Sequence, residues 1–157
     1  FAPFFAYLWV FLGKRNLDPN MPIKFAIGLI LMALGFIVMI FAVKYALVSS
    51  PVGVQWLLLT YLLHTFGELT LSPVGLSAFS KYSPKRYLGQ MMGIWFLASS
   101  LGGVLAGLFG GEATESGLES ISPVFTELVY YYLTIAAILI ALSFFIKGVS
   151  TNTNSTE

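Results

Sequence analysis

Four long apolar stretches, separated by short polar segments, constrain this chain more than any other feature of its sequence. They cover about residues 23–46, 53–79, 88–110 and 124–146, and each is limited by charged residues, Pro or Gly. A helix needs about 20 apolar residues to cross a bilayer, so each stretch is long enough to span one. Only helices satisfy their own backbone polar groups in lipid. We therefore predict an all-α fold, a polytopic helical bundle in a membrane.

The composition argues against a soluble protein and excludes several classes of function. Of the 157 residues, 57% are hydrophobic and 10% are charged, whereas soluble domains carry about 25% charged residues. A net charge of +1 offers no basic surface for nucleic acid, and the lack of cysteine excludes disulfides and Cys-based metal sites. The chain also lacks the His-Glu-x-x-His and Gly-x-Ser-Gly patterns of intramembrane enzymes. We expect no enzyme activity, no metal site and no nucleic-acid partner.

The two ends of the chain differ from the four spans. Residues 1–12 are apolar but too short to cross a bilayer, and they lack the basic start of a signal peptide. We interpret them as the end of a span that begins upstream, so that residues 1–147 form a partial transmembrane bundle. Residues 148–157 are predicted to be a polar cytoplasmic tail.

The basic residues predict how the spans are oriented. If successive spans are antiparallel, seven of the eight Lys and Arg residues fall on one side of the membrane, and only Lys44 falls on the other. The opposite loop, predicted over residues 111–123, is acidic. Because basic loops stay in the cytoplasm, we expect a multi-pass protein of the cell (inner or plasma) membrane with a cytoplasmic C-terminus.

Glu68 is a carboxylate in the middle of a predicted span, residues 53–79, that carries no other charged residue. An ionisable group at membrane depth costs about 2.5 kcal/mol or more, so it needs a partner, water or a proton. On a helical wheel it shares a stripe with these residues: Tyr61, His64, Thr65, Ser72 and Gly75. A polar stripe of this kind faces a bundle interior or an aqueous cavity.

Two neighbours of Glu68 admit more than one interpretation. Pro73 removes a helical hydrogen bond and is expected to kink the helix one turn from Glu68, which would let the inner half swing. The alternative is a purely structural proline. His64 is either a proton relay or substrate contact, or a neutral residue that makes hydrogen bonds.

The next span, residues 88–110, carries two distinct faces. Small residues follow one face at helical spacing: Gly89, Gly93, Ser100, Gly103, Gly107 and Gly111. We expect this face to pack closely against another helix of the bundle. Trp95 and Ser99 lie on a different face, and Ser99 should lie at the depth of Glu68, with Trp95 about one turn nearer the cytoplasm. The three side chains are predicted to line one cavity; the alternative is that Trp95 only fills space between helices.

These residues sit in a recognisable pattern. It consists of residues 67–77 (GELTLSPVGLS) and 91–98 (MMGIWFLA), with residues 24–29 (KFAIGL) further upstream. The pattern resembles the proton-dependent oligopeptide transporter (POT/PTR) family of the major facilitator superfamily. The resemblance implies that the chain runs from the end of helix eight to helix twelve, within the C-terminal six-helix half of that fold.

The resemblance also implies roles for single residues. Glu68 is similar to the helix-ten glutamate that contacts the peptide amino terminus, and Trp95 and Ser99 resemble pocket-lining residues of helix eleven. Further candidate pocket or gating residues are His64, Tyr61, Ser72, Pro73 and Phe96. The sequence departs from the family at Gly102-Gly103, where a Gly-Asn pair is expected.

The function implied is a fragment of a proton-coupled symporter of di- and tripeptides, which works by alternating access between two bundles. Protons are the coupling ion, and no other cofactor is expected. The expected partners are the peptide substrate, the lipid bilayer and the N-terminal bundle of the same protein, which is missing here. The alternatives are a major facilitator transporter of another small solute and a non-transporting membrane scaffold subunit. Glu68 argues against an anion, because like charges repel.

Overall fold

The computed structural model describes residues 2–15, 19–48, 52–115 and 117–153. Over these residues the chain forms five α-helices and one short 3-10 helix, without a strand. Their bounds are α1 (Ala2–Lys14), α2 (Met21–Val48), α3 (Gln55–Tyr82), η1 (Lys85–Tyr87), α4 (Leu88–Glu115) and α5 (Leu118–Thr153). The prediction of an all-α fold is confirmed.

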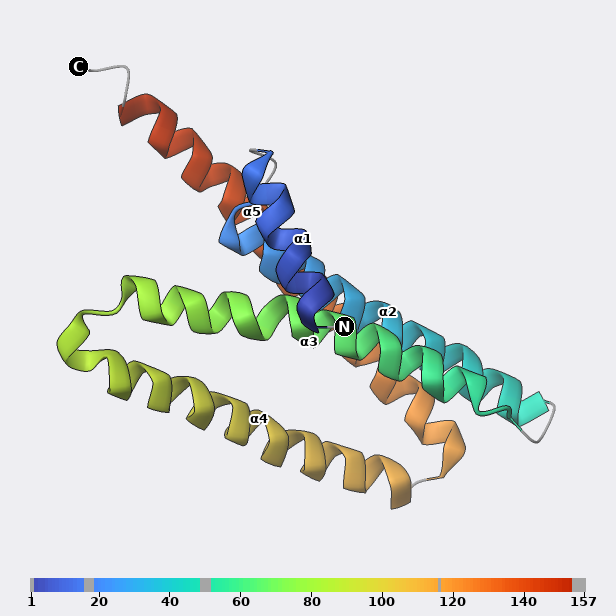
Figure 1. The fold of residues 1–157 in the computed structure, drawn as a ribbon. Coiled ribbons are helices and arrows are strands. Elements are labelled where there is room, and N and C mark those ends of the chain that lie inside the picture. Colours follow the sequence, from blue (N-terminus) through green and yellow to red (C-terminus); the bar gives the residue numbers. More distant parts are fainter. Residues whose placement is uncertain (1, 16–18, 49–51, 116, 154–157) are drawn as a thin grey trace.

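Helix α2 is the centre of the helix packing, because both α3 and α5 lie along it (Figure 1). Its buried residues are all Ala or Gly except one valine: Ala26, Gly28, Ala33, Gly35, Ala42 and Val43. Small residues let two helix backbones approach closely within a membrane. At the contact with α3, a Cβ added to Gly67 would lie 2.9 Å from the carbonyl oxygen of Gly28. The α2 and α3 backbones therefore touch at this pair of glycines.

The buried hydroxyl groups at this contact are paired within the chain. Thr70, which is 0% exposed, donates a hydrogen bond to the carbonyl of Phe66 at 2.8 Å. Thr60 donates to the carbonyl of Trp56 at 3.0 Å, and its hydroxyl also lies 3.5 Å from the carbonyl oxygen of Gly35. Bonds back to the preceding helical turn allow hydroxyl groups to be buried without leaving an unpaired donor.

Helix α4 stands apart from this packing. It is joined to α3 and α5 at its two ends, and none of its described residues is buried (Figure 1). The expected close contact along its small-residue face stays a prediction, because no described helix lies against that face: a Cβ added at Gly89, Gly93, Gly103, Gly107 or Gly111 would meet no other described atom within 4 Å. Small residues define a face that permits close approach, but they do not determine which helix fills it.

The predicted loop over residues 111–123 is also wrong. Helix α4 continues to Glu115 and α5 begins at Leu118, so that most of this segment is helical. Gly117 makes the reversal between them with φ of 86°, a left-handed conformation that glycine adopts without steric cost. Pro123 lies inside α5 rather than before it. Charged residues and a proline mark the edge of the apolar layer, and a helix can extend beyond that edge into water.

The C-terminal helix also extends beyond the edge of the apolar layer. Helix α5 continues beyond the predicted end of its span at residue 146 and into the polar residues 148–157, as far as Thr153. The last residues of the predicted tail, 154–157, lie outside the described residues. Its placement in the cytoplasm stays a prediction.

Within the part of the chain that the structure describes, three helical segments are long and apolar enough to cross a membrane: Met21–Val48, Lys85–Leu108 and Glu119–Phe145. Helix α3 is as long as α2, with 28 residues, which corresponds to about 42 Å. It is not among the three because its polar residues lower its hydropathy. It continues as a helix through Pro73.

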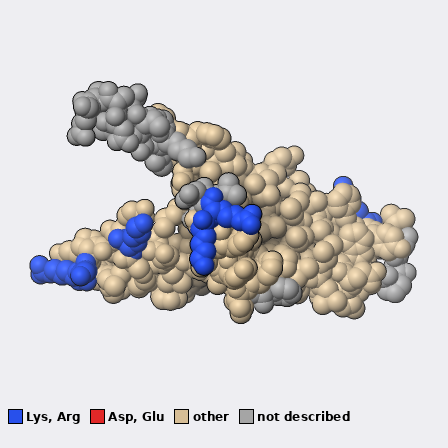
Figure 2. Space-filling view, turned by 45° about the horizontal axis from the view of Figure 1, so that its top comes forward, with Lys and Arg blue, Asp and Glu red and all other residues tan. Residues whose placement is uncertain are grey.

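Basic side chains gather toward one end and the middle of the face in Figure 2, where no acidic side chain is visible. They come from the helix ends that meet at the α1–α2 and α3–α4 connections, which carry Lys14, Lys24, Lys81, Lys85 and Arg86. Lys44 lies near the opposite end of α2. This distribution is the one on which the predicted orientation depends.

Candidate functional site

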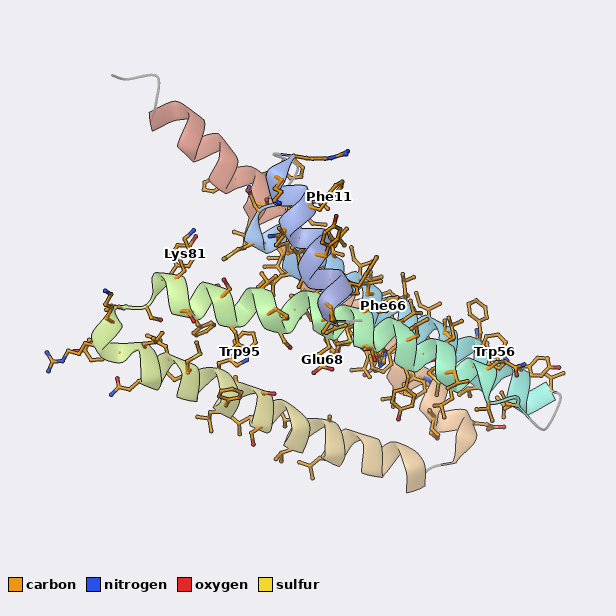
Figure 3. The ribbon with its side chains drawn as sticks, viewed as in Figure 1. Phe11, Trp56, Phe66, Glu68, Lys81 and Trp95 are labelled. Atoms are coloured by element: carbon orange, nitrogen blue, oxygen red, sulfur yellow. The ribbon has the colours of Figure 1, made fainter. Side chains whose placement is uncertain are left out.

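Glu68 lies at the middle of α3, and Figure 3 shows its side chain on the side of α3 that faces α4. The side chain is exposed, and it makes no hydrogen bond or ion pair within the part of the chain that the structure describes. A carboxylate in this position is an acceptor without a donor. It is therefore available to a cationic or hydrogen-bond-donating ligand, or to a side chain from outside this chain.

Trp95 points from α4 toward α3 and enters the same space between the two helices (Figure 3). Its indole packs on Gly75, where an added Cβ would lie 2.9 Å from Cζ2, and against the ring of Phe79, with ring centroids 5.3 Å apart. Because Gly75 has no side chain, the bulky ring can lie against the α3 backbone. Trp95 thus fixes the spacing of α3 and α4, as well as facing the space that Glu68 faces.

The ring of Trp95 contacts α3 at some distance from Glu68 along the helix. Gly75, which Trp95 contacts, is seven residues after Glu68 on the same face of α3, and seven residues correspond to about two helical turns. The predicted separation of about one turn concerns the positions of Glu68 and Trp95 along their helices rather than the reach of the ring, and it stays a prediction. Ser99 follows Trp95 by four residues on α4 and is exposed, so it lies about one turn closer to the level of Glu68.

The remaining candidates on α3 and α4 differ in their exposure. Tyr61 shares the face of Glu68, seven residues before it, and is 64% exposed. Pro73 and Phe96 are also exposed, and Ser72 is half-buried. Their roles as pocket or gating residues stay predictions.

His64 is placed away from this group, at the contact between α2 and α3. Its ring lies over Gly35, leaving no room for a Cβ there, and its centroid is 4.7 Å from that of Phe36. The Nε2 atom of its ring is buried and has no hydrogen-bond partner among the described residues. Phe36 in turn contacts the rings of Phe125 and Tyr132 on α5. In this structure His64 belongs to an aromatic cluster that joins three helices.

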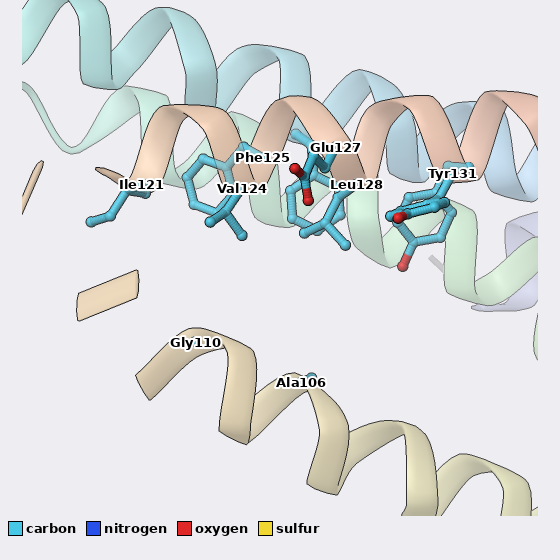
Figure 4. A pocket seen from close by; sticks show the side chains of 10 residues that line it. Ala106, Gly110, Ile121, Val124, Phe125, Glu127, Leu128 and Tyr131 are labelled. Carbon is cyan, nitrogen blue, oxygen red and sulfur yellow. The ribbon is translucent and has the colours of Figure 1, made fainter. Parts of the chain in front are cut away.

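A cavity that the sequence analysis did not anticipate lies between α4 and α5 (Figure 4). Its volume is about 500 Å³, and it is lined by Phe36, Ala106, Gly110, Ile121, Val124, Phe125, Glu127, Leu128, Tyr131 and Tyr132. The signal for it in the sequence was Glu127, a second carboxylate inside a predicted span, residues 124–146. None of the predicted site residues lines this cavity. Among the described residues, no cluster of His, Asp and Glu side chains could hold a metal ion.

Long apolar helices packed through small residues, with a carboxylate near the middle of one of them, define a multi-pass membrane protein. The sequence profile of the POT family matches residues 1–118. The chain belongs to the POT family.

Its relatives are named as transporters. The chain is 39% identical to the peptide transporter YePEPT of Yersinia enterocolitica, over 99% of this chain and 31% of the relative. It is 35% identical to dipeptide and tripeptide permease A of Chromobacterium violaceum, over 90% of this chain and 30% of the relative. These names point to a transporter rather than an enzyme.

Solved structures of the family share the fold. A POT family transporter in complex with a thioalcohol-conjugated peptide superposes with a TM-score of 0.75 and 30% identity, over 91% of this chain and 28% of that one. The peptide transporter POT in complex with sulfate gives 0.73 and 35%, with 90% and 28% covered. The fold is therefore part of a major facilitator bundle, and the chain spans less than a third of the length of the proteins it matches.

Proposed function

We propose that the full-length protein that carries this chain is a proton-coupled symporter of di- and tripeptides, and that Glu68 contacts the peptide amino terminus. The observation that carries the proposal is the Glu68 carboxylate, which leaves the middle of α3 toward α4 without a partner among the described residues. An unpaired charge at this depth is costly. A peptide ammonium group would satisfy it through a charge-assisted hydrogen bond.

The relatives support the class of substrate. Two of them are named for peptides, or for dipeptides and tripeptides. A POT family structure has also been solved with 5-aminolevulinic acid, a small molecule that carries an amino group and a carboxyl group. A cargo with an amino group fits a site built around a carboxylate.

The chain would supply one wall of the substrate site. In transporters of this type, substrate binds near the middle of the membrane, and two bundles rock around it. Glu68, Trp95 and Ser99 would form the C-terminal wall, and an N-terminal bundle outside this chain would form the other. Protons would be the coupling ion. The basic helix ends would lie in the cytoplasm, together with the C-terminus.

Uptake in proteoliposomes tests the proposal. Full-length protein, reconstituted with an imposed inward proton gradient, is expected to accumulate a labelled dipeptide, and a protonophore is expected to abolish the accumulation. Unlabelled di- and tripeptides should compete. Gradient-independent uptake would remove proton coupling. Accumulation of another small solute in place of peptides would favour the alternative cargo, and no transport at all would favour a scaffold subunit.

Trp95→Ala is expected to raise the apparent KM for a dipeptide by about tenfold, the effect of losing an aromatic contact worth ~1.5 kcal/mol. Trp95→Phe keeps a ring against Gly75 and Phe79 and should retain most of the affinity. The measurement is KM together with the yield of folded protein on gel filtration. A fall in folded yield with an unchanged KM would mean that Trp95 serves only to space α3 and α4.

A further inference from the structure

Thr65 differs from the other threonines of the chain in the hydrogen bonding of its hydroxyl group. Among the threonines whose side chains the structure describes, the other four donate a hydrogen bond to the carbonyl four residues earlier: Thr60, Thr70, Thr126 and Thr134. Thr65 makes no hydrogen bond within the described part of the chain. A bond back to the preceding turn is the usual way to pair a threonine hydroxyl in a helix. The Thr65 hydroxyl is instead available to a partner from outside these residues.

Thr65 lies next to Glu68 on α3. Three residues separate them, which places their Cβ atoms about 5–6 Å apart on the helix surface. Both side chains are exposed, whereas His64, the residue before Thr65, lies over Gly35 of α2. Because each residue turns a helix by about 100°, Thr65 leaves α3 on a different side from His64. A ligand group that pairs with the Glu68 carboxylate is therefore within reach of the Thr65 hydroxyl.

The exposure of α3 indicates from which side a ligand group approaches Glu68. Toward the end of α3 that joins η1, Ser72 is half-buried, and Gly75 is buried against the indole of Trp95. Toward the start of α3, Thr65 is exposed. Helices α3 and α4 are joined at η1 and separate from there (Figure 1). A ligand group therefore has room beside Glu68 on the Thr65 side, while the ring of Trp95 narrows the other side.

An ammonium group requires more than one acceptor. It carries three N–H donors and no acceptor. A donor that is withdrawn from water without an acceptor costs free energy, so a site that binds an ammonium group through one carboxylate gains from a second acceptor beside it. A hydroxyl group can accept from the ammonium group through its lone pairs and donate its own hydrogen to the carboxylate. Thr65 offers such a hydroxyl one turn from Glu68.

We propose that Thr65 is a further substrate-contacting residue, whose hydroxyl accepts a hydrogen bond from the peptide ammonium group that Glu68 binds. This assignment rests on the proposed function, which places the ammonium group at Glu68. It also adds a determinant of specificity, because only a free amino terminus brings enough donors for both side chains. Thr65 would therefore favour a cargo with a free amino group over one whose amino group is acylated.

Thr65→Val tests the contact in the full-length protein, because it replaces the hydroxyl with a methyl group of nearly the same shape. In proteoliposomes, the KM for a dipeptide with a free amino terminus is expected to rise about fivefold, the effect of losing one hydrogen bond, with little change in the maximal rate. Thr65→Ser keeps the hydroxyl and should retain the wild-type KM. Thr134→Val is the matched control, because Thr134 is exposed on α5 and its hydroxyl is paired with the carbonyl of Tyr130 at 2.7 Å. Its KM should stay at the wild-type value.

Two further measurements separate a substrate contact from a structural role. An N-acetylated dipeptide has no ammonium group, so its weak inhibition of labelled dipeptide uptake should be the same for the wild type and Thr65→Val. Combining Thr65→Val with Glu68→Gln should raise the KM by less than the product of the two single effects, because both side chains contact one group.

Three results would overturn the assignment of Thr65: an unchanged KM in Thr65→Val, equal weakening of the free and the acetylated peptide, or independent effects in the double variant. If Thr65→Val gives no folded protein on gel filtration, Thr65→Ala removes the same hydroxyl without the added methyl group and is judged by the same comparisons. Wild-type uptake together with any of the three results rejects only the role of Thr65. Absence of wild-type uptake rejects the proposed function itself.

Discussion

Glu68→Gln in the full-length protein is expected to lower proton-driven uptake of a dipeptide with a free amino terminus by about tenfold or more. Hydrogen bonds to charged groups contribute about 1.5–3 kcal/mol, and the neutral amide still accepts a hydrogen bond from an ammonium group but loses the attraction between opposite charges. The amide has nearly the same shape as the carboxylate, so the packing of α3 on α2 should be preserved. Initial rates of labelled dipeptide uptake in proteoliposomes measure the effect.

Two controls make this result specific to the site. Glu119→Gln makes the same chemical change on an exposed side chain in the first turn of α5 and should leave uptake unchanged. An N-acetylated dipeptide lacks the ammonium group, so it should compete poorly with the labelled dipeptide for uptake by the wild-type protein. For uptake by the Glu68→Gln protein it should compete no worse than it does for uptake by the wild type. Wild-type uptake rates in Glu68→Gln, or an unchanged preference for the free amino terminus, would remove Glu68 from the substrate site.

The sequence was sufficient to predict the elements and the main candidate residue, because both depend on local patterns. Apolar length predicted the helices, and helical spacing placed Glu68 and Trp95 on faces that turn toward each other (Figure 3). The contact of Trp95 with Gly75, two turns from Glu68, was not predictable. Counting residues gives the height of a Cα along its helix, whereas the tilt of the helix and the rotamer of the side chain decide what a large ring touches.

The features that the sequence left open depend on contacts distant in sequence. His64 shares the polar stripe of Glu68, yet four residues advance a helix by slightly more than one turn. This offset suffices to direct His64 onto Gly35 of α2 while Glu68 faces α4. The small residues of α4 lie on one face, and the helix that packs against this face stays a prediction. No local pattern in the sequence indicates that the glycines of α2 and α3, rather than those of α4, make the close contact here.

Gly67 is the position where that close contact permits the least change. A Cβ at Gly67 would lie 2.9 Å from the carbonyl oxygen of Gly28 and 3.1 Å from Cγ of Met32. The oxygen belongs to the α2 backbone and cannot rotate away, so even the smallest side chain must push α2 and α3 apart. Overpacking of this kind costs about 1–3 kcal/mol, although alanine is favoured over glycine in a helix by about 1 kcal/mol.

Gly67→Ala is therefore expected to lower the thermal unfolding midpoint of the full-length protein in detergent, and Gly67→Leu to remove most of the folded protein on gel filtration. Gly13→Ala is the matched control, because an added Cβ at Gly13 in α1 meets no described atom within 4 Å. Its midpoint should stay constant or rise slightly. If both alanine variants unfolded at the wild-type temperature, α2 and α3 would not be in backbone contact at Gly28 and Gly67. The central packing on which the position of Glu68 depends would then have to be different.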